Sequence, residues 1–268
     1  MSFCVLVASS DNRKDIFDVC FANSEHIWKD CDWPRFVGFN SPHPDQHGFS
    51  VVTAVPSGNW CEEVAQYVDA LPAHVQYILL MVEDVLFMRP VNADKLNEVA
   101  HYIWSGGLHY VRLVPVRRNW LGRMWERGSD NKIRLPMPFH VIDPREPYYS
   151  STEMVIWERN YLREQLDKPG DAWSFEHHVS RHAHWAVWET VFDQHQIVNK
   201  GYWNRRAPWY LAESVGCPTF RHAAIIKGSI TQTRPLQRWS SFLRGEMQNL
   251  NFALFGFTSF RVKRWLGF

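Results

Sequence analysis

The stretch Tyr77-Ile78-Leu79-Leu80-Met81-Val82-Glu83-Asp84-Val85 decides the fold. Its unbroken apolar run is typical of a central strand that is buried on both faces of a sheet. Two carboxylates follow at once. Because a buried carboxylate is costly unless it meets a cation or hydrogen-bond donors, we expect Glu83 and Asp84 to face a site at the strand's end. There they can bind a metal that bridges a diphosphate, or hold a ribose hydroxyl. A loop acid or helix N-cap is the alternative.

Strands and helices alternate on both sides of this stretch. Apolar runs predict further strands over 3–8, 35–39, 51–55 and 110–114, and helical spacing predicts helices over 15–28, 59–72 and 94–104. Asn59, with Glu62 three residues later, predicts the N-cap of the second helix. Such alternation indicates a largely parallel sheet with helices on its faces, whose ligands bind at the carboxyl ends of the strands. Ser9-Ser10-Asp11 follows the first strand and falls at that edge.

The second half of the chain is less regular. Residues 117–147 are rich in Arg, Pro and Gly and predict a long excursion over the site, as a lid or an acceptor loop. A short strand over 154–157 and a helix over 160–166 follow. The four histidines between residues 177 and 184 lack a third-ligand pattern, so we expect them at the surface or near an acceptor and not at a zinc ion.

Composition excludes several classes of protein. The chain has 268 residues and a net charge of +1, so we expect no nucleic-acid partner. Its five cysteines are an odd number without a CxxC pair, which argues against a disulfide framework or a cysteine zinc site. The apolar start resembles a first strand and not a signal peptide, and no apolar run is long enough to span a bilayer. These features predict a soluble or peripheral protein in a reducing compartment.

An ordered set of motifs resembles GT-A-type glycosyltransferases of bacterial surface polysaccharide and lipopolysaccharide biosynthesis. The resemblance covers roughly residues 3 to 210, and its motifs follow in order. The set consists of Asn59-Trp60, the stretch 77–87, Pro90-Val91-Asn92, the stretch 148–157, Ala172-Trp173-Ser174-Phe175-Glu176, and Ile197-Val198-Asn199-Lys200-Gly201-Tyr202-Trp203.

This resemblance implies a GT-A-like (Rossmann-like) α/β fold, with a mostly parallel central sheet and helices on both faces. Residues 1–233 would form the transferase domain and residues 234–268 an appended segment. It also implies a hexosyltransferase that moves a sugar from a UDP- or GDP-type donor to a glycan or lipid-linked acceptor. Because a single base suffices for in-line attack, we expect inversion. A nucleotidyltransferase, or a non-catalytic glycan- or membrane-binding protein on the same fold, is the alternative. The former would carry a Gly-rich, Lys- or Arg-bearing loop after the first strand, where this chain has Ser9-Ser10-Asp11.

The same resemblance assigns roles to individual residues. Glu176 would be the catalytic base, since its aromatic neighbours can raise its pKa, with Asp84 as the second catalytic residue. A surface glutamate at a helix start is the alternative for Glu176. The donor would be bound by Ser9, Asp11, Trp60, Glu83, Asp84, Lys200 and Arg205, and the acceptor by Glu153, Trp173 and His177.

The need for a metal stays open at this point. Asp84 would be the ligand for Mn²⁺ or Mg²⁺, but Val85 follows it, so the chain lacks an Asp-x-Asp motif there. Lys200 and Arg205 could neutralise a diphosphate instead, which would allow metal-independent catalysis.

The last segment, 234–268, is basic and aromatic, with six Lys or Arg side chains against the single acid Glu246. This mixture is typical of an interfacial segment on anionic lipid. A C-terminal helix packed on the domain is the alternative. We therefore expect a cytoplasmic protein, peripheral at the inner face of the cell membrane, that binds anionic vesicles in a salt-sensitive way.

Overall fold

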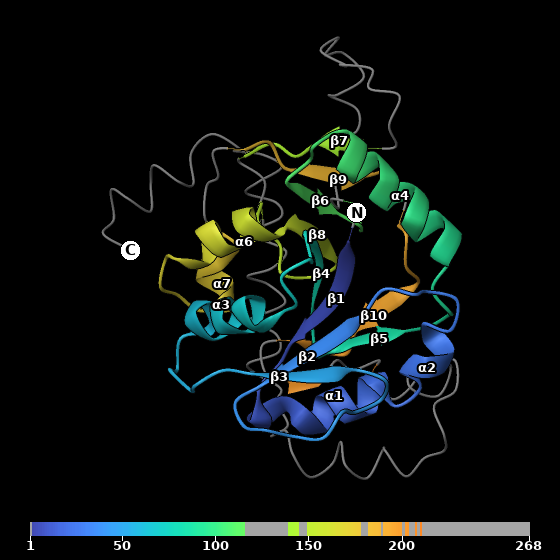
Figure 1. Cartoon of the computed structure of the whole chain (residues 1–268). Coiled ribbons are helices and arrows are strands. Elements are labelled where there is room, and N and C mark those ends of the chain that lie inside the picture. Colours follow the sequence, from blue (N-terminus) through green and yellow to red (C-terminus); the bar gives the residue numbers. More distant parts are fainter. Residues whose placement is uncertain are drawn as a thin grey trace, which may run out of the picture. The chain divides into compact units, whose positions relative to one another are not determined.

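The computed structural model describes residues 2–115, 139–144, 149–177, 182–188, 190–199, 202–203, 207 and 210. Eight strands form a sheet in the order β3-β2-β1-β4-β8-β6-β9-β7 (Figure 1). They are β1 (Phe3–Ala8), β2 (Arg35–Phe39), β3 (Ser50–Thr53), β4 (Tyr77–Val82), β6 (Tyr110–Arg112), β7 (Phe139–Val141), β8 (Val155–Glu158) and β9 (Trp185–Val187). Two short ribbons pair β5 (Val85–Phe87) with β10 (Gln194–Gln196), and β11 (Val198–Asn199) with β12 (Tyr202–Trp203).

All strands of the sheet except β8 and β7 run in one direction. β1 is parallel to β2 and β4, β2 to β3, and β6 to β9. β8 lies antiparallel between β4 and β6, and β7 is antiparallel to β9. The order β3-β2-β1-β4 is that of a Rossmann-like half-sheet. The predicted Rossmann-like, mostly parallel α/β sheet with helices is therefore confirmed.

Helices cover both faces of the sheet (Figure 1). They are α1 (Lys14–Phe21), α2 (Ser24–Ile27), α3 (Trp60–Ala70), α4 (Ala93–Ser105), α6 (Arg159–Leu166) and α7 (Ala172–Phe175). Two adjacent residues of β2 show that α3 and α1 cover different faces. A Cβ at Gly38 would lie 2.4 Å from the ring of Tyr67 in α3, whereas Phe39 meets Phe17 of α1 edge to face at 5.6 Å. Since successive side chains of a strand point to opposite faces, α3 and α1 lie on opposite sides of the sheet.

Some helices and strands begin or end at other residues than the sequence predicted. The single helix predicted over 15–28 is two helices, α1 and α2, because Asn23 leaves the helical region with φ −113° and ψ 25°. The strand predicted from Met154 begins one residue later, because Met154 has φ +53°. The helix expected after Asn59 is confirmed, and the Asn59 side chain accepts hydrogen bonds from the backbone of Cys61 and Glu62.

Other sequence predictions fall on parts of the chain that the structure does not describe. Within the expected excursion over 117–147, only residues 139–144 are described, and they contain β7, which the sequence did not predict. The lid role, the boundary after residue 233 and lipid binding by residues 234–268 therefore stay predictions.

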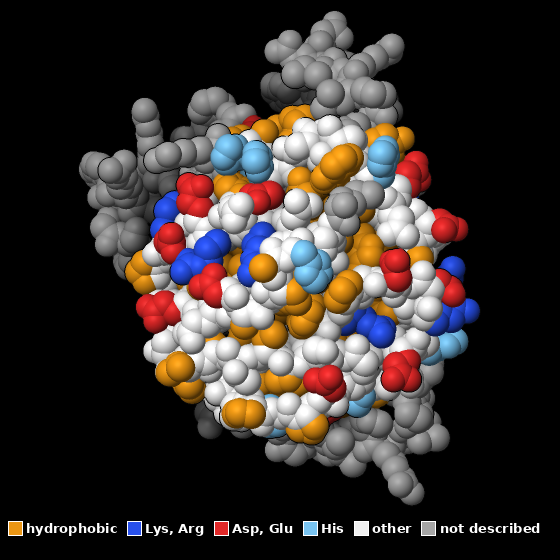
Figure 2. Space-filling model, in the orientation of Figure 1, with side chains coloured by type: hydrophobic (Ala, Val, Ile, Leu, Met, Phe, Trp, Pro, Cys, Tyr) orange, Lys and Arg blue, Asp and Glu red, His pale blue; other side chains and the backbone are white. Residues whose placement is uncertain are grey.

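Two surface findings bear on the expected partners. No helix among the described residues is long and apolar enough to cross a bilayer. On the face shown in Figure 2, acidic and basic side chains are interspersed among the described residues. This face therefore shows no continuous basic patch for a polyanion in the described part of the chain.

Arg159 is the first residue of α6, and its guanidinium caps the C-terminal end of α3. It donates hydrogen bonds to the carbonyl oxygens of Val68 at 2.8 Å, Pro72 at 2.8 Å and Leu71 at 3.1 Å. The last carbonyls of a helix have no partner within the helix, so a side chain that reaches them replaces the missing donors. Arg159 thereby fixes α6 against α3.

Replacing Arg159 with Ala should destabilise the fold. The change leaves these carbonyls without donors from the side chain, so we expect the free energy of unfolding to fall by about 1–3 kcal/mol. The matched control is Arg163→Ala one turn later, which removes a partly exposed ion pair with Asp69 at 3.1 Å and should cost about 0–1 kcal/mol. Urea denaturation measures both variants, and equal losses would contradict the capping role.

Candidate functional site

The register of β8 brings two acidic segments to one edge of the sheet. Val155 pairs with Leu80 of β4 and with Arg112 of β6. Because β8 is antiparallel to both, the residues before Val155 lie at the edge where β4 ends. Glu153 therefore comes close to Asp84, and burial and the charges of Glu83 and Glu153 together shift the pKa of Asp84 upward.

Asp84 is buried and held by two segments. Its side chain is 8% exposed, and its backbone oxygen accepts a hydrogen bond from Ile197 N at 2.9 Å. The amide of Gln196 donates to Oδ2 at 3.1 Å and to Oδ1 at 3.4 Å. Burial, reinforced by the charges of Glu83 and Glu153, raises the pKa of Asp84 to about 8. At neutral pH this carboxyl is therefore mostly protonated.

Glu83, which precedes Asp84, forms an ion pair with the segment that follows β1. Arg13, at the end of the 3-10 turn η1 (Asp11–Arg13), places its Nε 3.8 Å from Glu83 Oε1. Burial raises the pKa of Glu83, and the Arg13 charge opposes that rise. The carboxyl ends of β1 and β4 are thus linked by an ion pair.

Two glutamines that no sequence pattern indicated bind the acidic cluster, which consists of Glu83, Asp84 and Glu153. Gln194 and Gln196 are alternate residues of β10, so their side chains point to the same face of the ribbon. Gln194 Nε2 donates a hydrogen bond to Glu153 Oε1 at 3.0 Å, and Gln196 Nε2 donates to the carboxyl of Asp84. Pairing of Gln196 with Val85, directly after Asp84, sets this alignment. A polar strand of three residues gives no periodic signal, so only the fold reveals it.

Glu176 is a buried carboxylate at the end of α7, not a surface residue at a helix start. It is 8% exposed. Its Oε1 accepts hydrogen bonds from both N and Oγ1 of Thr152, each at 2.9 Å. Burial raises the pKa of Glu176, while Thr152 and the charge of Arg112 oppose the rise and the charge of Glu153 adds to it. The direction agrees with the raised pKa that we expected, and burial is its main cause.

The segment before β8 is a buried polar loop. Ser150, Ser151 and Thr152 are all buried, and Ser151 N donates to the Tyr110 hydroxyl at 2.9 Å. Met154 follows with a positive φ, which is unusual for a residue other than glycine and found often at functional sites. Its carbonyl accepts a hydrogen bond from Leu113 N at 2.8 Å, which holds the loop to the chain after β6.

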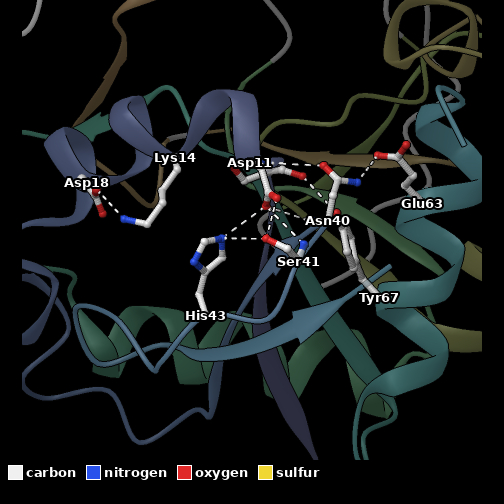
Figure 3. Close-up of polar contacts among 9 residues, drawn as sticks. Asp11, Lys14, Asp18, Asn40, Ser41, His43, Glu63 and Tyr67 are labelled. Carbon is white, nitrogen blue, oxygen red and sulfur yellow. Dashed lines mark hydrogen bonds and ion pairs between the residues drawn. The ribbon is translucent and has the colours of Figure 1, made fainter. Parts of the chain in front are cut away.

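Asp11 joins the carboxyl ends of β1 and β2 (Figure 3). Its carboxylate accepts hydrogen bonds from Asn40 N at 3.0 Å and Ser41 Oγ at 2.6 Å, and it lies 3.3 Å from His43 Nε2. Asn40 in turn donates to Glu63 of α3 at 2.9 Å. Burial would raise the pKa of Asp11, but the hydrogen bonds from these neighbours outweigh it and lower that pKa. Asp11 is thus an ionised connector between two loops.

The remaining predicted donor residues are placed as follows. Ser9 follows β1 directly, its carbonyl accepts a hydrogen bond from the Tyr67 hydroxyl at 3.2 Å, and its Oγ is buried with no partner among the described residues. Trp60 begins α3, and its ring lies 5.3 Å from that of Phe175, next to Glu176. Lys200 and Arg205 lie outside the described residues.

The predicted acceptor residues are Trp173, His177 and Glu153. Trp173 lies in α7 and is 48% exposed, and His177 follows Glu176 directly and is exposed. Glu153 lies in the loop before β8, close enough for its charge to act on Glu176. The charge of Glu153 thus reaches Glu176, while Trp173 and His177 are its neighbours in the chain.

His184 is a core residue and not the surface histidine that we expected. It is fully buried and stacks between the rings of Tyr110 at 3.8 Å and Tyr149 at 4.1 Å. Nε2 lies 2.8 Å from the Tyr161 hydroxyl and Nδ1 lies 3.0 Å from the Tyr149 carbonyl. Burial lowers the pKa of His184 to about 4, so the ring is neutral at pH 7. Its contact with the Tyr149 carbonyl holds the chain just before the buried loop.

The acidic edge carries the carboxylates that could bind a metal ion. Carboxylate oxygens suit Mn²⁺ or Mg²⁺, but the amide of Gln196 already contacts both oxygens of Asp84. Among the residues that the structure describes, no group of three or more His, Cys, Asp or Glu side chains is arranged to hold an ion. The need for a metal therefore stays a prediction.

Comparisons with known proteins give weak likenesses. No protein-family model and no curated protein matches the chain. Among solved structures, S. aureus TarS 1-349 has a TM-score of 0.43 and 11% identity over 72% of this chain, which spans 59% of the TarS fragment. Its complex with UDP-GlcNAc has a TM-score of 0.38 and 13% identity, covering 61% of this chain and 47% of that one. A mycobacterial protein has a TM-score of 0.43 and 16% identity, covering 82% of this chain and 76% of that one.

Asp84 should give the free energy of unfolding a defined pH dependence. Its pKa is about 8 in the folded protein and about 3.9 in an unfolded chain, so only the folded state holds the proton between these values. Because the unfolded state binds fewer protons there, the contribution of Asp84 to stability falls as pH rises from about 4 to about 8, by up to about 1.4 kcal/mol per pH unit.

Asp84→Asn removes this titration and should gain stability relative to the wild type as pH rises. Urea denaturation of both proteins at about pH 5, 7 and 9 measures the difference. A difference that does not change with pH would show that Asp84 titrates normally in the folded protein.

Proposed function

We propose that this chain transfers a hexose-type sugar from a nucleotide-diphosphate donor to a hydroxyl group of a glycan or lipid-linked acceptor. One observation carries the proposal. A buried carboxylate with a raised pKa, Glu176, is fixed by Thr152 at the ligand-binding edge of a Rossmann-like sheet. A base of this kind suits removal of a proton from a sugar hydroxyl near neutral pH.

Glu176 would take the acceptor proton during transfer. As the acceptor oxygen bonds to the anomeric carbon of the donor sugar, its proton passes to the carboxylate of Glu176. The bond between that carbon and the diphosphate oxygen breaks, and the nucleoside diphosphate leaves with the electron pair. One base on the acceptor side is sufficient for in-line attack, so we propose inversion at the anomeric carbon.

The donor would bind over the ends of β1, β2 and β4. In this proposal Asp11 and Ser9 hold the nucleotide, while Glu83 and Asp84 contact the ribose or the donor sugar. A protonated Asp84 can donate one hydrogen bond as well as accept others, which suits a hydroxyl-rich ligand. Lys200 and Arg205 would neutralise the diphosphate, a role that rests on the sequence alone.

The acceptor would bind beside α7. The exposed ring of Trp173 offers an apolar face on which a sugar can stack, next to His177 and the base. Assembly of a surface polysaccharide or lipopolysaccharide at the inner face of the membrane is the setting that the sequence motifs favour, and we include it in the proposal.

A thermal-shift screen tests donor binding. UDP- and GDP-sugars, with and without Mn²⁺, should raise the melting temperature, since a ligand at 100 times its dissociation constant stabilises by about 2.7 kcal/mol. Asp84→Ala should lose much of the shift, because it removes both the donor and the acceptor atoms of this carboxyl, whereas the surface variant Arg163→Ala should keep it. A wild-type protein that no nucleotide or nucleotide sugar stabilises would contradict the proposal. Stabilisation and turnover with a nucleoside triphosphate would favour a nucleotidyltransferase.

Glu176→Gln tests the base. Glutamine keeps the shape and the contact with Thr152 but cannot take up the proton, so the transfer rate should fall by about 10²–10⁴ while donor affinity stays the same. Calorimetry measures affinity, and product formation at saturating donor measures the rate. If affinity drops and saturated turnover is unchanged, Glu176 is a binding residue and the base is another carboxylate of the cluster.

A further inference from the structure

Thr152 donates two hydrogen bonds to one oxygen of the Glu176 carboxylate. Its backbone N–H and its hydroxyl both donate to the same carboxylate oxygen, Oε1, at 2.9 Å each. Within the described residues, no hydrogen bond reaches the other oxygen, Oε2. The two oxygens of one carboxylate are therefore in different environments, one held by two donors and one left available.

The surrounding loop makes this contact rigid. Thr152 is 6% exposed, and the Ser150 N–H donates to the Glu176 carbonyl at 3.3 Å, so the loop and the end of α7 are joined through backbone and side chain. Ser151 N–H reaches the buried Tyr110 hydroxyl at 2.9 Å. A loop that is buried with polar side chains is costly unless each donor finds a partner, and these bonds supply the partners.

We propose that Thr152 is the positioning residue for the base: it fixes Oε1 of Glu176 with two hydrogen bonds, so that Oε2 faces the acceptor hydroxyl and takes its proton. The inference rests on the proposed function, and it adds a residue that acts through Glu176 without touching the substrate. Thr152 donates to the ionised form of the carboxylate and so favours it over the protonated form.

Three other influences act on Glu176. Burial in the loop and α7 raises its pKa, the charge of Glu153 raises it further, and the charge of Arg112 from β6 lowers it. The hydroxyl of Thr152 is a neutral donor that opposes the first two. Its loss should raise the titration midpoint of Glu176 by about one pH unit, because a hydrogen bond to a charged group is strong enough for a shift of that size.

The test is a carboxyl-carbon NMR titration of the full chain labelled with ¹³C-glutamate. Loss of one signal in Glu176→Gln assigns the resonance. Thr152→Val removes the hydroxyl at nearly constant volume, and we expect its Glu176 midpoint to rise by about one pH unit, with Thr152→Ser returning it to the wild-type value. Ser151→Ala is the matched control, since it removes a buried hydroxyl from the same loop that bonds Glu153 N at 3.2 Å and not Glu176.

Turnover gives an independent reading of the same variants. The acidic limb of the kcat/KM profile should move to higher pH in Thr152→Val by the same amount as the NMR midpoint, with the KM for the donor unchanged. If Thr152→Val does not fold, Thr152→Ala takes its place.

Two results would overturn the inference. One is a Glu176 midpoint that stays at its wild-type value without the Thr152 hydroxyl. The other is an equal shift in Ser151→Ala, which would indicate a general role of the loop. A shifted NMR midpoint in a protein that turns over no nucleotide sugar would instead reject the proposed function and keep Thr152 as the residue that positions Glu176.

Discussion

Burial of carboxylates at one edge of the sheet is the constraint on which the rest of the site depends. Asp84 and Glu176 are each 8% exposed, and the charge of Glu153 acts on both. Burying several negative charges close together destabilises the folded protein. Nearby cations can offset this cost, or the carboxylates can take up protons, which raises their pKa values. The described side chains that hydrogen-bond to these carboxylates are neutral, so raised pKa values follow.

The choice of neutral donors has a chemical consequence. Gln196 and Thr152 hold Asp84 and Glu176 in place by hydrogen bonds from neutral groups. A bidentate arginine in the same positions would hold each group as firmly but would lower its pKa by one to three units, to about the range of a permanently ionised acid. Carboxyl groups with raised pKa values, as Asp84 and Glu176 have, are the kind that can act as acids and bases.

The sequence predicted the parts of this arrangement that depend on local patterns. The buried run at 77–82 and the N-cap at Asn59 follow from periodicity and capping preference, and both are confirmed. The glutamine pair of β10 could not be predicted, because three polar residues form a strand only where β5 offers them a partner. Burial of Glu176 likewise depends on a loop far away in sequence, and on the antiparallel direction of β8 that brings this loop to the edge.

The turn η1 joins the two halves of the edge. At its start Asp11 is bonded to Asn40 and Ser41 after β2, and at its end Arg13 is paired with Glu83 after β4. One turn of three residues therefore sets the relative positions of the carboxyl ends of β1, β2 and β4. Polar groups that are already held by one another lose little further freedom when a ligand arrives, and this reduces the entropic cost of binding. The acidic cluster and the loops beside it are in this sense one preorganised unit, although its members come from distant parts of the sequence.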